Sequence, residues 1–103
     1  MTAVAYEVRV TLPPDLEAAF AAYMTGKHIP EILATGCFRA AAFERLGPGL
    51  CRTRYEAASQ GDLDRYLEAH APHFRADFLE HFPPDPRVEV SREVWTESWR
   101  GVG

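Results

Sequence analysis

The sequence has little positive charge. Lysine occurs once, as Lys27, and ten arginines bring the basic total to 11 against 15 acidic residues, a formal net charge of −4 at pH 7. Nucleic acids and anionic membrane surfaces attract proteins mainly through clusters of basic residues. We therefore expect neither nucleic acid nor a membrane among the partners of this protein.

Long hydrophobic runs are also missing. The longest uninterrupted apolar stretch is residues 18–24, whereas about 20 residues are needed to cross a bilayer. The first residues lack the basic segment and apolar run of a secretory signal, so we expect no signal peptide. These features favour a cytoplasmic location.

Cysteine is scarce, and its two occurrences do not suit a disulfide. Cys37 and Cys51 flank a turn at residues 47–49. In a hairpin around that turn Cys51 faces Arg45 and Cys37 faces Ser59, so the two thiols are several residues out of register. Unpaired thiols are typical of a reducing compartment.

Motifs of well-known cofactor and catalytic sites are absent. We find no phosphate-binding glycine loop, Cys-x-x-Cys pair, nucleophile elbow or paired-carboxylate signature. His70 and His73 have a spacing that permits two metal ligands, but a third ligand is not evident. We therefore expect no cofactor and no metal, and the sequence alone leaves open whether the protein is an enzyme.

What is present is the composition of one globular domain. The chain has 103 residues, of which 47% are hydrophobic and 25% charged, and this is ordinary for a single folded domain over residues 1–103. Four segments read as strands, two by their alternation and two by flanking the turn at residues 47–49: residues 3–11, 37–46, 50–58 and 87–98.

Helical periodicity occupies the two intervals between these strands. Residues 15–26 predict a helix, with a kink or break where Gly26 and Pro30 interrupt it and a short helical segment after it. A second apolar stripe runs from Leu63 to Phe78, with a bend expected near Glu68 because of Pro72. The element order predicts an α+β, ferredoxin-like βαββαβ fold, a four-stranded antiparallel sheet with two helices on one face.

The other face of this sheet is expected to be only partly polar. It would carry charged side chains, with Glu44 opposite Arg52 in the hairpin register, together with Phe38 and Trp95. One interpretation is a solvated face with ordinary ion pairs. The other is a homodimer in which two such faces meet as a dimeric α+β barrel, and the two large rings favour it.

His28 is the histidine most suggestive of function. It lies beside Pro30 and three residues before Glu31, and interrupted helices expose backbone groups and often border pockets. Its imidazole could transfer protons near neutral pH, or it could simply cap the short segment that follows. We predict a ligand site with His28 and Glu31 at its rim and either Arg54 or Tyr55 from the sheet.

An arginine cluster gives a second candidate for ligand binding. Arg9, Arg52 and Arg54 could bind a carboxylate or phosphate. The neighbouring acidic side chains could equally neutralise them: Glu7, Glu44 and Glu56.

Residues 28–38 (His-Ile-Pro-Glu-Ile-Leu-Ala-Thr-Gly-Cys-Phe) and 63–72 (Leu-Asp-Arg-Tyr-Leu-Glu-Ala-His-Ala-Pro) resemble a family of short bacterial proteins known as a domain of unknown function. The resemblance covers nearly the whole chain and implies membership of the dimeric α+β barrel superfamily. Relatives there include cofactor-free monooxygenases, muconolactone isomerases, chlorite dismutases and haem-degrading enzymes. The resemblance names no catalytic residue, and no haem-ligand motif transfers to any histidine.

These observations lead us to expect a homodimer that binds a small organic molecule, with an acid as one candidate, near residues 26–30. Two other functions stay open. A cofactor-independent monooxygenase or isomerase would need a general base in a dry pocket. A structural or protein-interaction module would be favoured by a filled core without a cavity near about 300 Å³.

Overall fold

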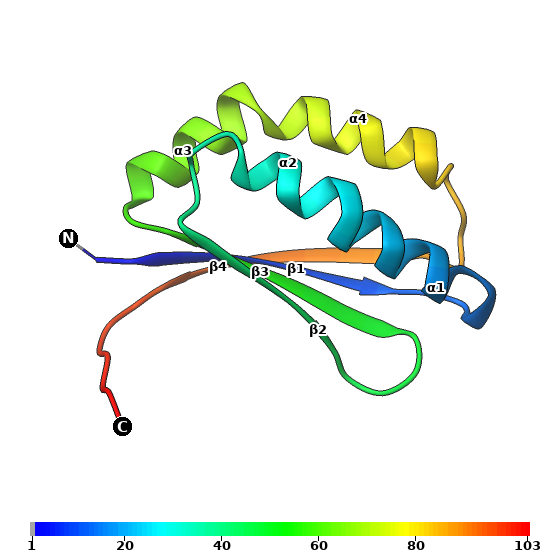
Figure 1. The fold of residues 1–103 in the computed structure, drawn as a ribbon, viewed down its shortest axis with the longest axis horizontal. Coiled ribbons are helices and arrows are strands. Elements are labelled where there is room, and N and C mark those ends of the chain that lie inside the picture. Colours follow the sequence, from blue (N-terminus) through cyan, green and yellow to red (C-terminus); the bar gives the residue numbers. More distant parts are fainter. Residues whose placement is uncertain (1) are drawn as a thin grey trace.

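A computed structural model describes residues 2–103 and contains a four-stranded antiparallel sheet with all helices on one face (Figure 1). The strands are β1 (Val4–Thr11), β2 (Ala40–Arg45), β3 (Leu50–Ala57) and β4 (Glu89–Thr96), in the spatial order β2-β3-β1-β4. This confirms the predicted ferredoxin-like α+β fold, in which the first and last strands pair although most of the chain separates them.

The β2–β3 hairpin has the register expected from its turn. Arg45 lies opposite Cys51 and Glu44 lies opposite Arg52, and the Arg52 guanidinium donates to the Glu44 carboxylate at 3.0 Å. Cys37 and Cys51 are both buried free thiols.

Phe38 departs from its predicted place on the outer face, by which we mean the face of the sheet away from the helices. The chain turns at Gly36, which has a positive φ of 77°, and regular alternation begins only at Ala40. Phe38 therefore packs in the core, with its ring centroid 5.2 Å from that of Tyr55 and 4.8 Å from that of Tyr66. The prediction was wrong because period-two alternation does not extend through a bend.

The first helical arm continues where a kink or break was predicted. It consists of α1 (Pro14–Tyr23), a π-helical turn η1 (Met24–His28) and α2 (Ile29–Leu33). The Ile29 N–H bonds to the Met24 carbonyl, five residues earlier. Pro30 has no N–H, and its ring would clash with the Gly26 carbonyl in an α-helix. The wider turn accommodates the proline and leaves the arm unbroken.

The second helical arm bends, as predicted, slightly later than Glu68. It consists of α3 (Gln60–Ala69) and α4 (Ala71–His81), joined at His70, whose backbone angles are not helical. Ser59 caps α3, because its hydroxyl accepts the Asp62 N–H at 3.2 Å. Pro72 falls in the first turn of α4, where its missing N–H removes no helical hydrogen bond.

The hydrophobic core lies between the sheet and these two arms. Phe20, Ile32 and Leu63 from the helices are at most 1% exposed and pack against buried residues of β1 and β3. β4 is different, because all of its residues are exposed along the strand. The helices thus cover the centre of the sheet and leave the β4 edge open.

Substitution of Gly49 tests how closely the β2–β3 hairpin approaches the backbone at Leu12. A Cβ at Gly49 would lie 2.7 Å from the Leu12 carbonyl oxygen, whereas a Cβ at Gly47 meets nothing within 4 Å, and both residues have positive φ. We expect Gly47→Ala to lower the free energy of unfolding by about 1 kcal/mol and Gly49→Ala to lower it clearly more. Urea unfolding of both variants measures the difference, and equal losses would contradict the close approach.

Candidate functional site

A cavity of about 270 Å³ lies between the two helical arms and the sheet. Most of its lining is apolar, with contributions from β1, from the first arm and from α4: Val8, Val10, Phe20, Met24, Ile32, Phe74 and Phe78. Four uncharged polar side chains also line it, namely Tyr6, His28, Tyr55 and Tyr66. An apolar cavity with a few converging polar groups is the usual form of a small-molecule site.

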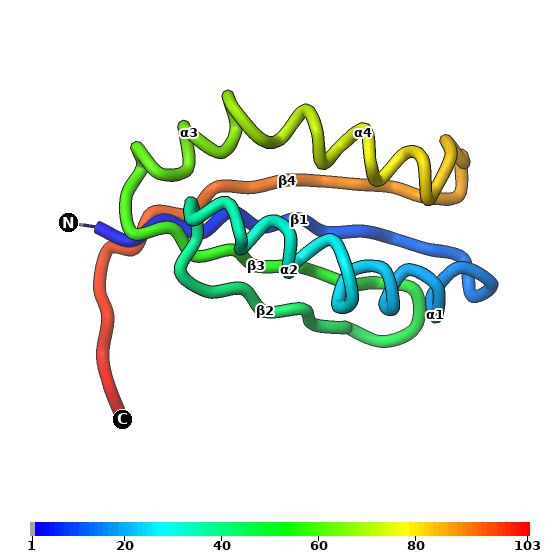
Figure 2. Tube along the Cα trace, turned by 45° about the horizontal axis from the view of Figure 1, so that its top comes forward, coloured from blue at the N-terminus to red at the C-terminus, as the bar shows by residue number. Residues whose placement is uncertain are grey.

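The cavity opens between α4 and β4. Leu79 of α4 and Val90 of β4 line it and are both exposed. Arg75 of α4 and Arg92 of β4 also line it and are exposed. Figure 2 shows these two elements running along the same edge of the molecule. The opening is therefore flanked by two arginines, while the histidine and tyrosines lie deeper.

The π-helical turn determines where the His28 side chain lies. Residues five apart in an α-helix are about 140° apart around the axis, so Tyr23 and His28 would point in different directions. Hydrogen bonding between residues five apart brings the later side chain nearly above the earlier one. The Tyr23 hydroxyl accordingly lies 3.0 Å from His28 Nδ1.

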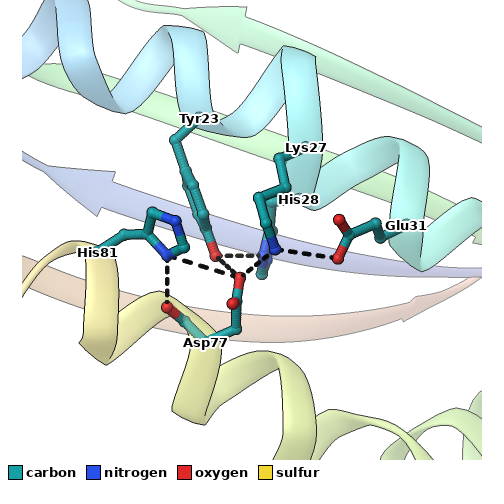
Figure 3. A network of polar contacts seen from close by, with 6 residues as sticks. All are labelled: Tyr23, Lys27, His28, Glu31, Asp77 and His81. Atoms are coloured by element: carbon teal, nitrogen blue, oxygen red, sulfur yellow. Dashed lines mark hydrogen bonds and ion pairs between the residues drawn. The ribbon is translucent and has the colours of Figure 1, made fainter.

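A polar network joins the two arms beside the cavity (Figure 3). The Tyr23 hydroxyl donates to Asp77 Oδ2 at 2.8 Å, and Lys27 Nζ donates to the same oxygen at 3.0 Å. His81 Nδ1 lies 2.9 Å from the Asp77 carbonyl oxygen. Asp77, on α4, therefore holds the π-helical turn of the first arm against the second arm.

The direction of these hydrogen bonds defines the state of His28. Tyr23 has one O–H, and it is given to Asp77, so His28 Nδ1–H must donate to the tyrosine oxygen. Burial lowers the pKa of His28 to about 4, against the opposing effect of Asp77. His28 is therefore neutral at pH 7, and its Nε2, which has no hydrogen-bond partner in residues 2–103, carries a free lone pair.

Asp77 remains ionised in this network. Its hydrogen bonds from Tyr23 and Lys27 lower the pKa of the Asp77 carboxyl. The pKa of Tyr23 is raised, first by burial and then by its hydrogen bond to Asp77. The charge thus stays on Asp77, while Tyr23 and His28 remain neutral. Because Asp77 accepts the hydrogen bond of the Tyr23 hydroxyl, His28 donates through Nδ1 and keeps Nε2 as an acceptor.

The cavity tyrosines lie close enough to influence one another. Burial, followed by the neighbouring tyrosines, raises the pKa of Tyr55, and burial with a contribution from Tyr6 raises the pKa of Tyr66. Both phenols are therefore protonated at neutral pH. Together with His28 they offer a ligand neutral hydrogen-bonding groups inside an apolar enclosure.

The structure brings together two of the four predicted site residues. His28 and Tyr55 both line the cavity. Glu31 is exposed on the first arm and pairs with Lys27 at 3.2 Å. Arg54 lies on the outer face, opposite Glu7 of β1, because neighbouring residues of a strand point to opposite faces. Arg54 and Tyr55 therefore cannot contribute to one site within a subunit.

Several residues of the site were not predicted. Tyr23 and Asp77 are 54 residues apart in the sequence, and only the packing of the two arms brings them together. The sequence did contain a local indication that Arg75 and Arg92 are unpaired. Neither has an acidic residue at the spacings that normally give a surface ion pair on a helix or along a strand.

The arrangement can bind and orient a small molecule by hydrogen bonds. In residues 2–103 no group of three or more His, Cys, Asp and Glu side chains is placed to hold a metal ion. No helix in this part of the chain has the length and apolar character needed to cross a membrane.

A ferredoxin-like sheet with two helical arms over one face, and a cavity beneath them, defines the structural class of this protein. The protein-family model described as "Domain of unknown function (DUF4286)" matches residues 3–85. The chain therefore belongs to the DUF4286 family, which confirms the resemblance inferred from residues 28–38 and 63–72. Comparison with curated proteins gives no match.

Solved structures with this fold share little sequence with the chain. A protein of unknown function from Nitrosomonas europaea is 19% identical, with a TM-score of 0.66 over 100% of this chain and 98% of its own. A dimeric ferredoxin-like protein from an uncultured marine organism is 12% identical, with a TM-score of 0.66 over 98% and 100%. A Deinococcus radiodurans protein provisionally assigned as an antibiotic biosynthesis monooxygenase is 15% identical, with a TM-score of 0.59 over 97% and 99%.

Proposed function

We propose that this protein is a homodimer that binds one small organic molecule per subunit in the cavity between the helical arms and the sheet. The observation that carries the proposal is the cavity itself, about 270 Å³ in volume and lined by apolar side chains around His28, Tyr55 and Tyr66. A protein that served only as a scaffold would gain stability by filling this space, because empty apolar volume costs packing energy.

The outer face of the sheet provides the support for proposing a second subunit. Trp95 lies on this face opposite Ala5 and is 52% exposed, and Trp99 is 82% exposed. Beyond β4 the chain turns away on the side opposite the helices (Figure 1). A second copy would cover both rings, and the dimeric ferredoxin-like neighbour is consistent with such self-association.

The buried free thiols of Cys37 and Cys51 suit a reducing compartment. We therefore include a cytoplasmic location in the proposal.

Filling the cavity should abolish ligand binding. We expect a fragment library of small acids, amides and alcohols to yield ligands that perturb the NMR amide signals of His28 and Tyr55. Val8→Phe should weaken the binding of these ligands at least tenfold, because Val8 lines the cavity and the larger phenyl ring occupies it. Val94→Phe is the matched control, because Val94 is also on the helix side of the sheet but lies outside the cavity.

Two outcomes of this screen would contradict the proposal. One is a library that yields no ligand for the wild type. The other is a set of ligands that bind Val8→Phe as tightly as they bind Val94→Phe, which would place their site elsewhere.

The second candidate function is a cofactor-independent monooxygenase or isomerase. The observation that favours it is the Asp77–Tyr23–His28 chain, which holds the Nδ1 side of a neutral imidazole and leaves Nε2, free of partners from residues 2–103, on a ring that lines the cavity. Such a nitrogen can accept a proton from a bound molecule, and the ligands found by the screen are the compounds to examine for turnover.

A further inference from the structure

Three arginines stand apart from the rest of the chain. Seven of the ten arginines form an ion pair with an Asp or Glu side chain. Within residues 2–103 the remaining three, Arg54, Arg75 and Arg92, have no such partner. Arg54 lies on the outer face, whereas Arg75 and Arg92 both line the cavity at its opening.

The surroundings of Arg75 and Arg92 explain why they are unpaired. The helical neighbours of Arg75 three and four residues away are Ala71, Pro72, Phe78 and Leu79. The cross-strand neighbour of Arg92 is Val8, which lines the same cavity. Two guanidinium groups are thus placed among apolar side chains without a protein carboxylate to neutralise them.

Both guanidinium groups affect the pKa of a tyrosine inside the cavity. Arg75 and Arg92 each lower the pKa of Tyr66, against the rise that burial causes, as expected for positive charges at the mouth of the cavity that Tyr66 lines. Both arginines are exposed, and two unpaired positive charges at the mouth of a cleft raise the local concentration of anions. The opening therefore attracts an anion, while the neutral interior does not solvate one.

We propose that the ligand is a small carboxylic acid, bound with its carboxylate between Arg75 and Arg92 and its apolar body in the cavity, and with a hydroxyl at the far end donating to His28 Nε2. This inference rests on the proposed function and adds the class of ligand. A carboxylate fits because a guanidinium presents two parallel N–H donors to its two oxygens. A hydroxyl fits because neutral His28 has a lone pair to accept its hydrogen bond.

The test uses 4-hydroxyphenylacetate and its uncharged primary amide, 4-hydroxyphenylacetamide. Dissociation constants are measured by NMR titration for the wild type, for the Arg75→Met/Arg92→Met double variant and for Arg54→Met. We expect the wild type to bind the acid at least tenfold more tightly than the amide. The double variant should lose this preference and bind the amide within twofold of the wild type.

Arg54→Met is the matched control, because it removes an equally unpaired arginine from the other face of the sheet, and it should keep the preference. Raising the salt concentration from 50 to 500 mM should weaken binding of the acid to the wild type and leave the amide unchanged, a readout that needs no variant. Equal binding of acid and amide by the wild type would overturn the inference, as would a preference that survives in the double variant.

Binding of the amide alone would overturn the inference and leave the proposed function in place. Binding of neither compound would also overturn it, and the fragment screen with Val8→Phe then decides the proposed function separately.

Discussion

Lowering the pH from 7 to 4 is expected to destabilise the protein by up to about 3 kcal/mol through His28 alone. In the folded protein the pKa of His28 is about 4 because the ring is buried, whereas in the unfolded chain it is near 6.5. Below pH 6.5 the unfolded chain therefore binds a proton that the folded protein does not bind. The free energy of unfolding falls through this range and levels off near pH 4.

Urea unfolding at a series of pH values measures this effect. His28→Gln keeps a donor for Tyr23 but does not titrate, so its stability should change much less between pH 6.5 and 4. His73→Gln is the control, since His73 is exposed on α4, and it should retain the wild-type slope. Equal slopes for His28→Gln and the wild type would contradict the buried, neutral state of His28. Asp77 does not account for this difference in slope, because its lowered pKa places its own effect on the free energy of unfolding at lower pH.

The second large effect is expected at the dimer interface. Placing a charge at Trp95 should raise the dissociation constant of the dimer at least thirtyfold, because a buried tryptophan at an interface contributes about 2 kcal/mol or more. We expect Trp95→Asp to be monomeric at concentrations where the wild type has twice the chain mass of 11.6 kDa. Sedimentation velocity measures both masses.

Val94→Asp provides the matched control for this variant. It introduces the same charge into the same strand, at a residue that is 49% exposed but lies on the helix side of the sheet. It should remain a dimer. A monomeric wild type across the micromolar range would contradict the proposed homodimer and leave the exposure of Trp95 and Trp99 without this explanation.

The fold could be predicted from the sequence where its determinants are local. The turn at residues 47–49 is short and contains glycines, so it determines the register of β2 and β3 down to the pairing of Glu44 with Arg52. Pro72 marks the bend of the second arm in the same local way. Phe38 was misplaced because its side chain follows the backbone bend after Gly36 and not the alternation of β2.

The site was only partly predictable. Pro30 drew attention to His28 because a proline inside a helix must alter its hydrogen bonding, although the resulting π-helical turn has no clear sequence signature. Alternation along β3 places Arg54 and Tyr55 on opposite faces, so a site beneath the helices could contain only one of them, and the structure places Tyr55 there. Asp77 could not be assigned to His28 from the sequence, since their link depends on how the two arms pack.

The central claim is that the cavity beside the π-helical turn holds a small molecule. The most direct measurement is an isotope-filtered NMR experiment on the wild type with the tightest-binding ligand from the fragment screen. We predict nuclear Overhauser effects from the protons of this ligand to the methyl groups of Val8, Met24 and Ile32, which line the cavity. Effects confined to exposed methyl groups such as those of Leu46, or no intermolecular effects at all, would contradict the claim.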